Sequence, residues 1–381
     1  MKNDHFLAAL GSVVLLAASL LLAPHASAAG WNLTDLGAFA GGSSNARGLT
    51  PDGRVAGFSL EADGQPYPFL SSGGQIVKVG SGMGATVTVN AQGQSAGAIL
   101  GADGSMHVGL FVGQTSTDLG SIDGGINVVS RINNNTQVVG YTILANYDER
   151  AFVATTNGIV NLGTLGGRFS RAIAINGSGV ITGYSTTSPT NNLNRCFVSY
   201  GNGLVNIGSL ALTGSCLPSA INDAGQIVGT AYNGTASHAF LYDGYQFHDL
   251  GTLGGNTSAA NGVNQLGQVV GQAQTASGDI RAFLYSAGHM TNLGSPRATG
   301  GVSSAYAVNG SGQAIGYYTV PGDSTRRPLL FSNGNVIELN TLLPALTEVD
   351  GTFIYLNDAG QIAGTGKING ARHAFLLTPV P

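Results

Sequence analysis

A unit of about 40–48 residues repeats along most of this 381-residue chain. Residues 249–294 form one copy, DLGTLGGNTSAANGVNQLGQVVGQAQTASGDIRAFLYSAGHMTNLG. Its four short apolar runs, at 258–264, 268–274, 281–286 and 289–293, are separated by glycine and polar turn residues, which is typical of short strands rather than helices. Four strands in a repeat of this length are typical of a β-propeller blade.

Three positions mark the copies. An asparagine begins the turn after the first strand, because its side chain starts tight turns, and a glycine three residues later supplies the positive φ that closes the turn. The asparagine recurs at Asn90, Asn133, Asn176, Asn222, Asn264, Asn309 and Asn357, with Thr50 in the first copy. The glycine ending the second strand recurs at Gly57, Gly97, Gly140, Gly183, Gly229, Gly271, Gly316 and Gly364. The third-strand aromatic recurs at Phe69, Phe111, Phe152, Phe197, Phe240, Phe283 and Phe375, with Leu329 in the seventh copy. The sequence therefore predicts an all-β, eight-bladed β-propeller with four-stranded blades.

The ends of the repeat array predict how the ring closes. The eighth copy stops after its third strand, residues 372–378, and the array begins with an unmatched fourth strand, residues 31–37. If the N-terminal strand completes the last blade, no sheet edge stays open at the seam. An open solenoid would need no such complementary ends.

Residues 1–28 have the features of a secretory signal peptide. Lys2 provides the positive start, 6–23 is the apolar segment, and Ala26-Ser27-Ala28 matches an A-x-A cleavage site. An uncleaved membrane anchor is the alternative, since the apolar segment is almost long enough to cross a bilayer. We expect residues 29–381 to form a single propeller domain that is secreted to the extracellular space or the periplasm, with no membrane span in the mature chain. We further expect a monomer.

Composition argues against several classes of partner. Charged residues make up 9% of the chain and the formal net charge is −4, whereas nucleic-acid binding normally requires a basic stripe. The histidines show no HxH or HExxH spacing, so we expect no metal site. No G-x-S-x-G elbow is present, and the LGTLGG motif lies between strands rather than before a helix, so it is no phosphate loop. We expect no cofactor.

The two cysteines, Cys196 and Cys216, occupy slots that Ala282 and Ser258 hold in the unit at 249–294. Secretion favours a disulfide, which would join blade 4 to blade 5. Two separate buried thiols are the alternative, because spacing in the sequence does not give the distance between the side chains.

Several motifs together resemble the HAF-repeat family of bacterial extracellular proteins. They are His238-Ala239-Phe240 and His373-Ala374-Phe375, LGTLGG at 162–167 and 250–255, and the INxxGQxxG pattern at 221–229. The resemblance covers nearly all of residues 31–378. It implies secretion and a repeat architecture, and no single activity.

One face of the predicted ring is more variable than the other. Antiparallel strands place the second-to-third loops and the blade-to-blade connections on one face, and these segments differ in length and content, as at 141–150, 184–195, 317–327 and 339–350. Function in repeat folds tends to lie on the variable face. We therefore expect a ligand to bind there, around the central channel.

A basic residue precedes the alanine slot of the third strand in six blades. These residues are Arg150, Arg195, His238, Arg281, Arg327 and His373. A cationic ring for a polyanionic glycan is one interpretation. We favour a repeated hydrogen bond between neighbouring blades, since a role needed in most blades is more often architectural.

Residues that break the repeat are better candidates for a binding site. The candidates at or near the start of first strands are Arg47, Arg168, Arg171 and Arg297, with Tyr306 in the slot that matches Arg47. Tyr147, Asp148 and Glu149 lie on one variable loop, and Glu348 and Asp350 lie on another. The alternative is that these are ordinary solvated loop charges.

Three functions fit this sequence. The favoured one is a secreted protein that binds an extracellular polymer, a polysaccharide or another matrix component, through the variable face without chemistry. The second is a polysaccharide lyase acting on an acidic sugar, for which Arg171, Arg47, Tyr306 and His107 are the first suspects, because such enzymes need a cation beside the uronate and a His or Tyr base. The third is a protein-interaction scaffold in a biofilm matrix. The sequence assigns no catalytic residue.

Overall fold

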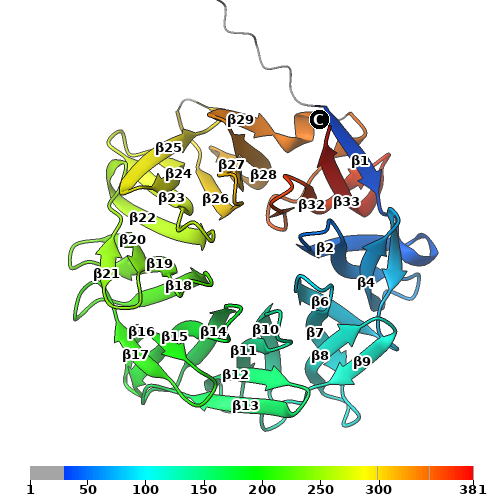
Figure 1. Ribbon diagram of the computed structural model, residues 1–381, viewed down its shortest axis with the longest axis horizontal. Helices are drawn as coiled ribbons and strands as arrows, with labels where there is room; N and C mark the ends of the chain where they lie inside the picture. Colours follow the sequence, from blue (N-terminus) through cyan, green and yellow to red (C-terminus); the bar gives the residue numbers. More distant parts are fainter. Residues whose placement is uncertain (1–29, 298, 343, 381) are drawn as a thin grey trace, which may run out of the picture.

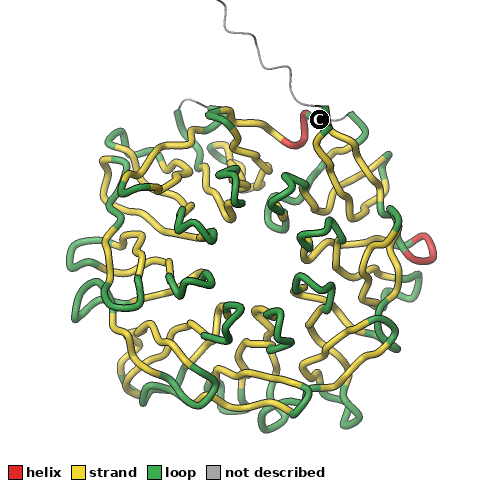
Figure 2. Tube along the Cα trace, in the orientation of Figure 1, coloured by secondary structure: helices red, strands yellow, loops and turns green. Residues whose placement is uncertain are grey.

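The computed structural model describes residues 30–297, 299–342 and 344–380, and they form a ring of eight antiparallel sheets around a central axis (Figure 1). The predicted eight-bladed β-propeller is confirmed. Strands and turns account for nearly all of it, with helix confined to two short 3-10 segments (Figure 2). The predicted signal peptide at 1–28 lies outside the described residues. Within those described ranges, no helix is long and apolar enough to cross a membrane.

Each of the first seven blades is a four-stranded meander whose first strand faces the axis (Figure 1). The strands of blades 1 to 4 are β2 (Ser43–Leu49), β3 (Val55–Leu60), β4 (Pro66–Ser72) and β5 (Gln75–Lys78); β6 (Gly84–Val89), β7 (Ser95–Leu100), β8 (Met106–Val112) and β9 (Thr115–Asp118); β10 (Ile126–Ile132), β11 (Val138–Ile143), β12 (Glu149–Thr155) and β13 (Gly158–Gly163); β14 (Ser170–Ile175), β15 (Ile181–Ser188), β16 (Asn191–Ser199) and β17 (Val205–Gly208). Those of blades 5 to 7 are β18 (Cys216–Ile221), β19 (Ile227–Tyr232), β20 (Ser237–Tyr242) and β21 (Phe247–Asp249); β22 (Gly254–Val263), β23 (Val269–Thr275), β24 (Ile280–Ser286) and β25 (His289–Gly294); β26 (Ser303–Val308), β27 (Ala314–Val320), β28 (Asp323–Ser332) and β29 (Asn335–Glu338).

Blade 8 closes the ring by joining the two ends of the array. Its strands are β30 (Leu346–Thr347), β31 (Tyr355–Leu356), β32 (Ile362–Ile368), β33 (Ala371–Pro379) and β1 (Trp31–Asp35). β1 pairs antiparallel with β33, from Trp31 opposite Pro379 to Asp35 opposite Phe375. The predicted closure by the N-terminal strand is confirmed.

Blade 8 also departs from the repeat at its inner edge. Two short strands, β30 and β31, both pair with β32 in place of one continuous first strand. The chain between β29 and β31 contains the 3-10 helix η2 (Leu339–Thr341), whereas the other 3-10 helix, η1 (Phe39–Gly41), lies where the chain enters blade 1. The longer path before β31 leaves room for the site described below.

The recurrent glycine and aromatic residue form the core of each blade. In blades 1 to 7 the first strand carries a β-bulge opposite the second-strand glycine, which brings a first-strand carbonyl oxygen towards it. A Cβ on Gly271 would lie far inside van der Waals contact of the Ala259 carbonyl oxygen and 2.9 Å from a ring carbon of Phe283. The position tolerates no side chain because the bulge and the ring fill the space.

We expect Gly271→Ala to lower the free energy of unfolding by about 1–3 kcal/mol, because overpacking a close-packed interior costs that much. Chemical denaturation followed by circular dichroism measures this change. Gly82→Ala is the matched control, since a Cβ there meets no atom within 4 Å. Equal stability of the two variants would contradict the packing argument.

In blade 2 the predicted position of the third-strand aromatic residue is wrong. The residue opposite the second-strand Gly97 is Gly109 and not Phe111. Phe111 lies two residues later on the third strand, opposite Ser95. The ring of Phe111 returns to the volume of the missing aromatic, because a Cβ on Gly109 or Gly84 would lie 3.1 or 2.7 Å from its Cζ. The sequence places a phenylalanine two residues after the expected third-strand position. The shift could not be recognised from the sequence, because the Phe111 ring fills the same part of the core.

Neighbouring blades are pinned by a serine at the start of the first strand. Ser258 Oγ accepts a hydrogen bond from the Ala239 amide of the preceding blade at 2.8 Å and donates to the Gly251 carbonyl of the connection at 2.5 Å. The same paired bonds are made by Ser44, Ser170 and Ser303. At the junction of blades 4 and 5 a disulfide between Cys196 and Cys216, with Cα atoms 5.3 Å apart, replaces this pin. The predicted pairing of the two cysteines is confirmed.

The turn asparagines form a second set of links between blades. The side-chain amide of each donates to the backbone carbonyl of the matching residue in the next blade at 2.9–3.2 Å, and Asn357 donates to Thr50 across the seam. Each asparagine oxygen also accepts amide hydrogen bonds within its own turn, as Asn222 does from Gln226. Each of these buried side chains therefore satisfies backbone hydrogen-bonding groups in two blades, which explains the recurrence of asparagine at this position.

Candidate ligand-binding site

The predicted site residues divide into two groups on opposite sides of the ring, with Arg297 apart from both. Arg168, Arg171, Asp148, Glu149 and Tyr147 belong to blades 3 and 4, whereas Arg47 and Tyr306 lie beside blade 8 (Figure 1). Arg297 is an exposed residue of the connection between blades 6 and 7. One ligand of ordinary size cannot contact all of them.

The group in blades 3 and 4 is a closed ionic network. Asp148 accepts from Arg168 Nε at 2.7 Å and from Arg150 Nη2 at 3.0 Å, and Glu149 accepts from Arg171 Nη2 at 2.6 Å. The Arg168 hydrogen bond holds the pKa of Asp148 below its usual value, and Glu149 raises the pKa of Arg171. Both carboxylates are buried, so these charges hold the β11–β12 loop against blade 4. Tyr147 is the exception, with 80% of its surface exposed.

The group beside blade 8 is aromatic and cationic. The guanidinium carbon of Arg47 lies 3.8 Å from the ring centre of Phe353 and 5.1 Å from that of Phe58. Both Arg47 and Tyr306 occupy the first-strand bulge of their blades, as their matching slots predict. Burial lowers the pKa of Arg47, because the charged guanidinium is partly removed from water.

Tyr306 connects blade 7 to the irregular part of blade 8. Its hydroxyl donates to the Gly351 carbonyl at 3.0 Å, and its ring stacks on Tyr317 with centroids 5.3 Å apart. Arg326 lies over Tyr317 at 4.7 Å and donates to the Tyr306 oxygen at 3.3 Å. Burial raises the pKa of Tyr306, so its phenol stays protonated.

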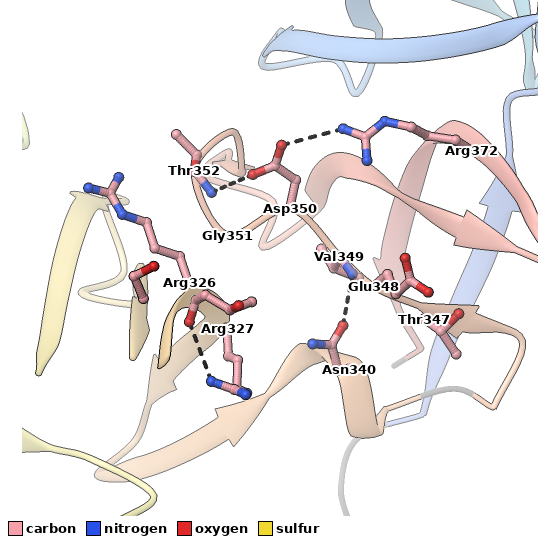
Figure 3. Close-up of a pocket in the computed structure, with 12 residues that line it drawn as sticks. Arg326, Arg327, Asn340, Thr347, Glu348, Val349, Asp350, Gly351, Thr352 and Arg372 are labelled. Carbon is pink, nitrogen blue, oxygen red and sulfur yellow. Dashed lines mark hydrogen bonds and ion pairs between the residues drawn. The ribbon is translucent and has the colours of Figure 1, made fainter. Parts of the chain in front are cut away.

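An open pocket of about 620 Å³ lies beside this group, between blades 7 and 8 on the variable face (Figure 3). The start of β28, the segment before β31 and Arg372 of β33 surround it. Its lining is predominantly polar: Ser324, Thr325, Arg326, Arg327, Asn340, Thr347, Glu348, Val349, Asp350, Gly351, Thr352 and Arg372.

Internal hydrogen bonds orient the polar groups of this pocket. Asp350 accepts from the Thr352 amide at 2.9 Å and lies 3.5 Å from Arg372 Nη2, and Asn340 Oδ1 accepts from the Val349 amide at 3.1 Å (Figure 3). Pre-positioned donors and acceptors of this kind favour a hydroxyl-rich ligand.

The sequence identified part of this pocket. Glu348 and Asp350 were candidates, and the segment at 339–350 was among the variable ones, but Arg326, Arg372 and Phe353 were missed. The available signal was the interval between Gly316 and Gly364, which is the longest in the array. A long interval identifies an insertion without identifying the side chains that face it.

Three of the six repeated basic residues make the hydrogen bond towards the neighbouring blade that the sequence favoured, whereas Arg327 pairs with Asp323 of its own blade. Arg150, Arg195 and Arg281 donate to backbone carbonyls of the connection to the next blade. In three other blades a histidine pairs with the aspartate of the fourth strand, at 2.8 Å in each case: His107 with Asp118, His238 with Asp249, and His373 with Asp35. His107 is thus a seventh basic residue in this slot, which the shifted register of blade 2 concealed.

The four lyase suspects do not meet. Arg47 and Tyr306 lie beside blade 8, but Arg171 of blade 4 is bound to Glu149 of blade 3, and His107 is bound to Asp118 within blade 2. The described ranges contain no group of three His, Cys, Asp or Glu side chains that could hold a metal ion.

No family model matches the chain, and no curated protein matches its sequence. Among solved structures it is similar to an acylaminoacyl peptidase, at 11% identity and a TM-score of 0.50, over 86% of this chain and 58% of that one. A puromycin-hydrolyzing peptidase from Mycobacterium tuberculosis matches at 13% identity and a TM-score of 0.49, over 89% and 60%. The lectin BP39L from Burkholderia pseudomallei matches at 9% identity and a TM-score of 0.37, over 91% and 99%. The chain therefore spans about 60% of the length of each peptidase, and at these identities the likeness concerns the fold alone.

Proposed function

We propose that this protein is a secreted repeat protein that binds an extracellular polysaccharide through the variable face, with the pocket between blades 7 and 8 as its contact site. One observation carries the proposal: the repeat is broken where the chain before β31 leaves the blade pattern, and that departure builds a polar pocket. Departures from a repeat on the variable face are where binding sites of such folds occur.

The chemistry of the pocket suits a sugar chain. Asn340, Asp350 and Arg372 offer fixed donors and acceptors for hydroxyl groups. Phe353 follows the lining residue Thr352, is 36% exposed and carries the Arg47 guanidinium against its ring. The pocket is open to solvent, which is what a long polymer requires, because the chain must enter and leave the contact region.

The disulfide supports the secreted location. Bonded cysteines persist in oxidising compartments and are rare in the cytosol. The A-x-A motif at residues 26–28 and the HAF-type motifs favour the same location, and we propose membership of the HAF-repeat family on those motifs.

We expect a panel of immobilised polysaccharides to retain the protein without any change in polymer length. The double variant Arg326→Ala with Arg372→Ala should bind at least about tenfold more weakly, because each lost hydrogen bond to a charged group contributes about 1.5–3 kcal/mol. Affinity electrophoresis measures the retention, and size-exclusion chromatography measures the polymer length.

Tyr147→Ala is the matched control, because Tyr147 is exposed on the same face at blade 3. It should bind as the unchanged protein does. A larger loss for Tyr147→Ala than for the double variant would move the site to blades 3 and 4. A shortened polymer would show that the protein depolymerises its ligand, which would contradict a function in binding alone.

A further inference from the structure

Two cavities lie along the central channel. The larger, of about 550 Å³, is bounded by β2, β6, β10 and the segment that ends in β31. The smaller, of about 230 Å³, is bounded by the first strands of blades 3 to 7. Their walls are formed by the strands nearest the axis (Figure 1).

The channel cavities have an unbalanced charge. Arg47 and Arg131 line the larger cavity, and Arg131 lines the smaller one as well. Among the described residues that line either cavity, none carries a carboxylate. Arg131 contributes to both walls, so its side chain lies between the two cavities within the channel.

The two arginines are held in the same way. Each donates from Nη1 to the carbonyl of its own preceding residue at 2.9 Å, Arg47 to Ala46 and Arg131 to Ser130. Neither forms an ion pair in the ranges that the structure describes. Most lysines and arginines in the described ranges do have a carboxylate partner, as Arg54 has Asp52 and Lys367 has Glu348.

Aromatic residues of blade 8 complete the larger cavity. Phe353 packs against the Arg47 guanidinium. Tyr355 also lines the cavity; burial raises the pKa of its hydroxyl, and the positive charges of Arg47 and Arg131 act in the opposite direction. Asp350 is the carboxylate that acts on Arg47, but it does not line the cavity and is already engaged by Arg372 and the Thr352 amide. The cavity therefore combines two cations and a ring surface, with no carboxylate in its lining.

We propose that this channel cavity is an anion-binding site, in which Arg47 and Arg131 bind a carboxylate or sulfate group. Guanidinium groups recognise both oxyanions through charge-assisted hydrogen bonds. The pocket on the variable face adjoins the cavity through residues 350–353, so a polymer seated in that pocket can place an acidic substituent in the channel. The polymer form of this inference rests on the proposed function, which it extends to acidic polysaccharides, whereas binding of a free small anion does not.

Isothermal titration at constant ionic strength separates these cases. The probes are inorganic sulfate, a uronic-acid oligosaccharide and the neutral oligosaccharide with the same linkages. We expect the acidic oligosaccharide to bind at least about tenfold more tightly than the neutral one, and Arg131→Gln to remove that preference. Arg131→Lys should restore part of it, because the charge is kept and the planar guanidinium is lost.

Arg297→Gln is the matched control, since Arg297 is exposed, has no carboxylate partner among the described residues and lies on the connection between blades 6 and 7. It changes the net charge equally and should leave all affinities unchanged. Arg131→Gln should leave the fold intact, because the side chain is exposed and its loss removes little packing. The melting temperature checks this.

Each outcome of this experiment is informative. Binding of sulfate that Arg131→Gln removes, with no binding of any oligosaccharide or polysaccharide, would support the anion site and refute the proposed function. Equal binding of neutral and acidic oligosaccharides, with no sulfate bound and no effect of Arg131→Gln, would overturn the anion site and keep the proposed function. Equal effects of Arg131→Gln and Arg297→Gln would show a general charge effect and overturn the inference too.

Discussion

Reduction of the bond between Cys196 and Cys216 is expected to lower the free energy of unfolding by about 3 kcal/mol. The bond closes a loop with a sequence separation of 20, and closing a loop of that size restricts the unfolded chain by about this amount. Denaturant titration with and without reductant measures the change.

The repeat itself provides a sharper form of this experiment. In four other blade junctions the slot of Cys216 holds a serine that bonds to the preceding blade, as Ser258 does to Ala239 and Gly251. We therefore expect Cys196→Ala with Cys216→Ser to be more stable than Cys196→Ala with Cys216→Ala by about 1–2 kcal/mol, since two hydrogen bonds are restored. Equal stability of these two double variants would show that the serine pin does not transfer to this junction.

Replacing Leu36 by alanine should lower the free energy of unfolding by about 2–5 kcal/mol, the range for removing a buried leucine side chain. Leu36 is 3% exposed and packs in a cluster with Phe69, Ala363 and Ala374 at the seam between blades 8 and 1. Its backbone donates to the Ala374 carbonyl at 3.1 Å and accepts from the Ile76 amide at 3.2 Å, so it joins the two ends of the array.

Asn32→Ala is the control for this measurement, because Asn32 is exposed on the adjacent strand β1. Its effect should stay within about 0.5 kcal/mol. Urea titration of both variants compares them directly. A small effect of Leu36→Ala would mean that the seam contributes little to the stability of the closed ring.

The fold was predictable because its recurring residues have local structural roles, in turns, bulges and blade cores, that require particular residue types. Asn264 closes a turn and links two blades, Gly271 lies against a bulge, and Phe283 fills the centre of a blade. Each task requires nearly the same residue type in every copy, so the pattern survives divergence. Phe111 shows where this prediction fails. In blade 2 a glycine stands at the usual aromatic position, and a phenylalanine two residues later fills the core in its place.

The candidate site was less predictable because it depends on contacts between residues that no local pattern relates. Arg47 and Phe353 meet only once the ring has closed, and Arg131 enters the same cavity from two blades away. The loop charges Asp148 and Glu149 looked equally promising in the sequence, but their partners Arg168 and Arg171 occupy them fully. Which charges remain available is decided by tertiary pairing.

The direction of the links between blades has a consequence for biosynthesis. Except at the seam, each turn asparagine donates to the blade that follows it in the chain, and each of these serines is supplied by the later blade to the earlier one. A blade emerging from the ribosome therefore has unsatisfied polar groups until its successor is made, and each newly made blade satisfies those of its predecessor. The last of these groups, Asn357 and the Ala374 amide, find their acceptors at Thr50 and Ser44, which are among the first residues of the array to be synthesised.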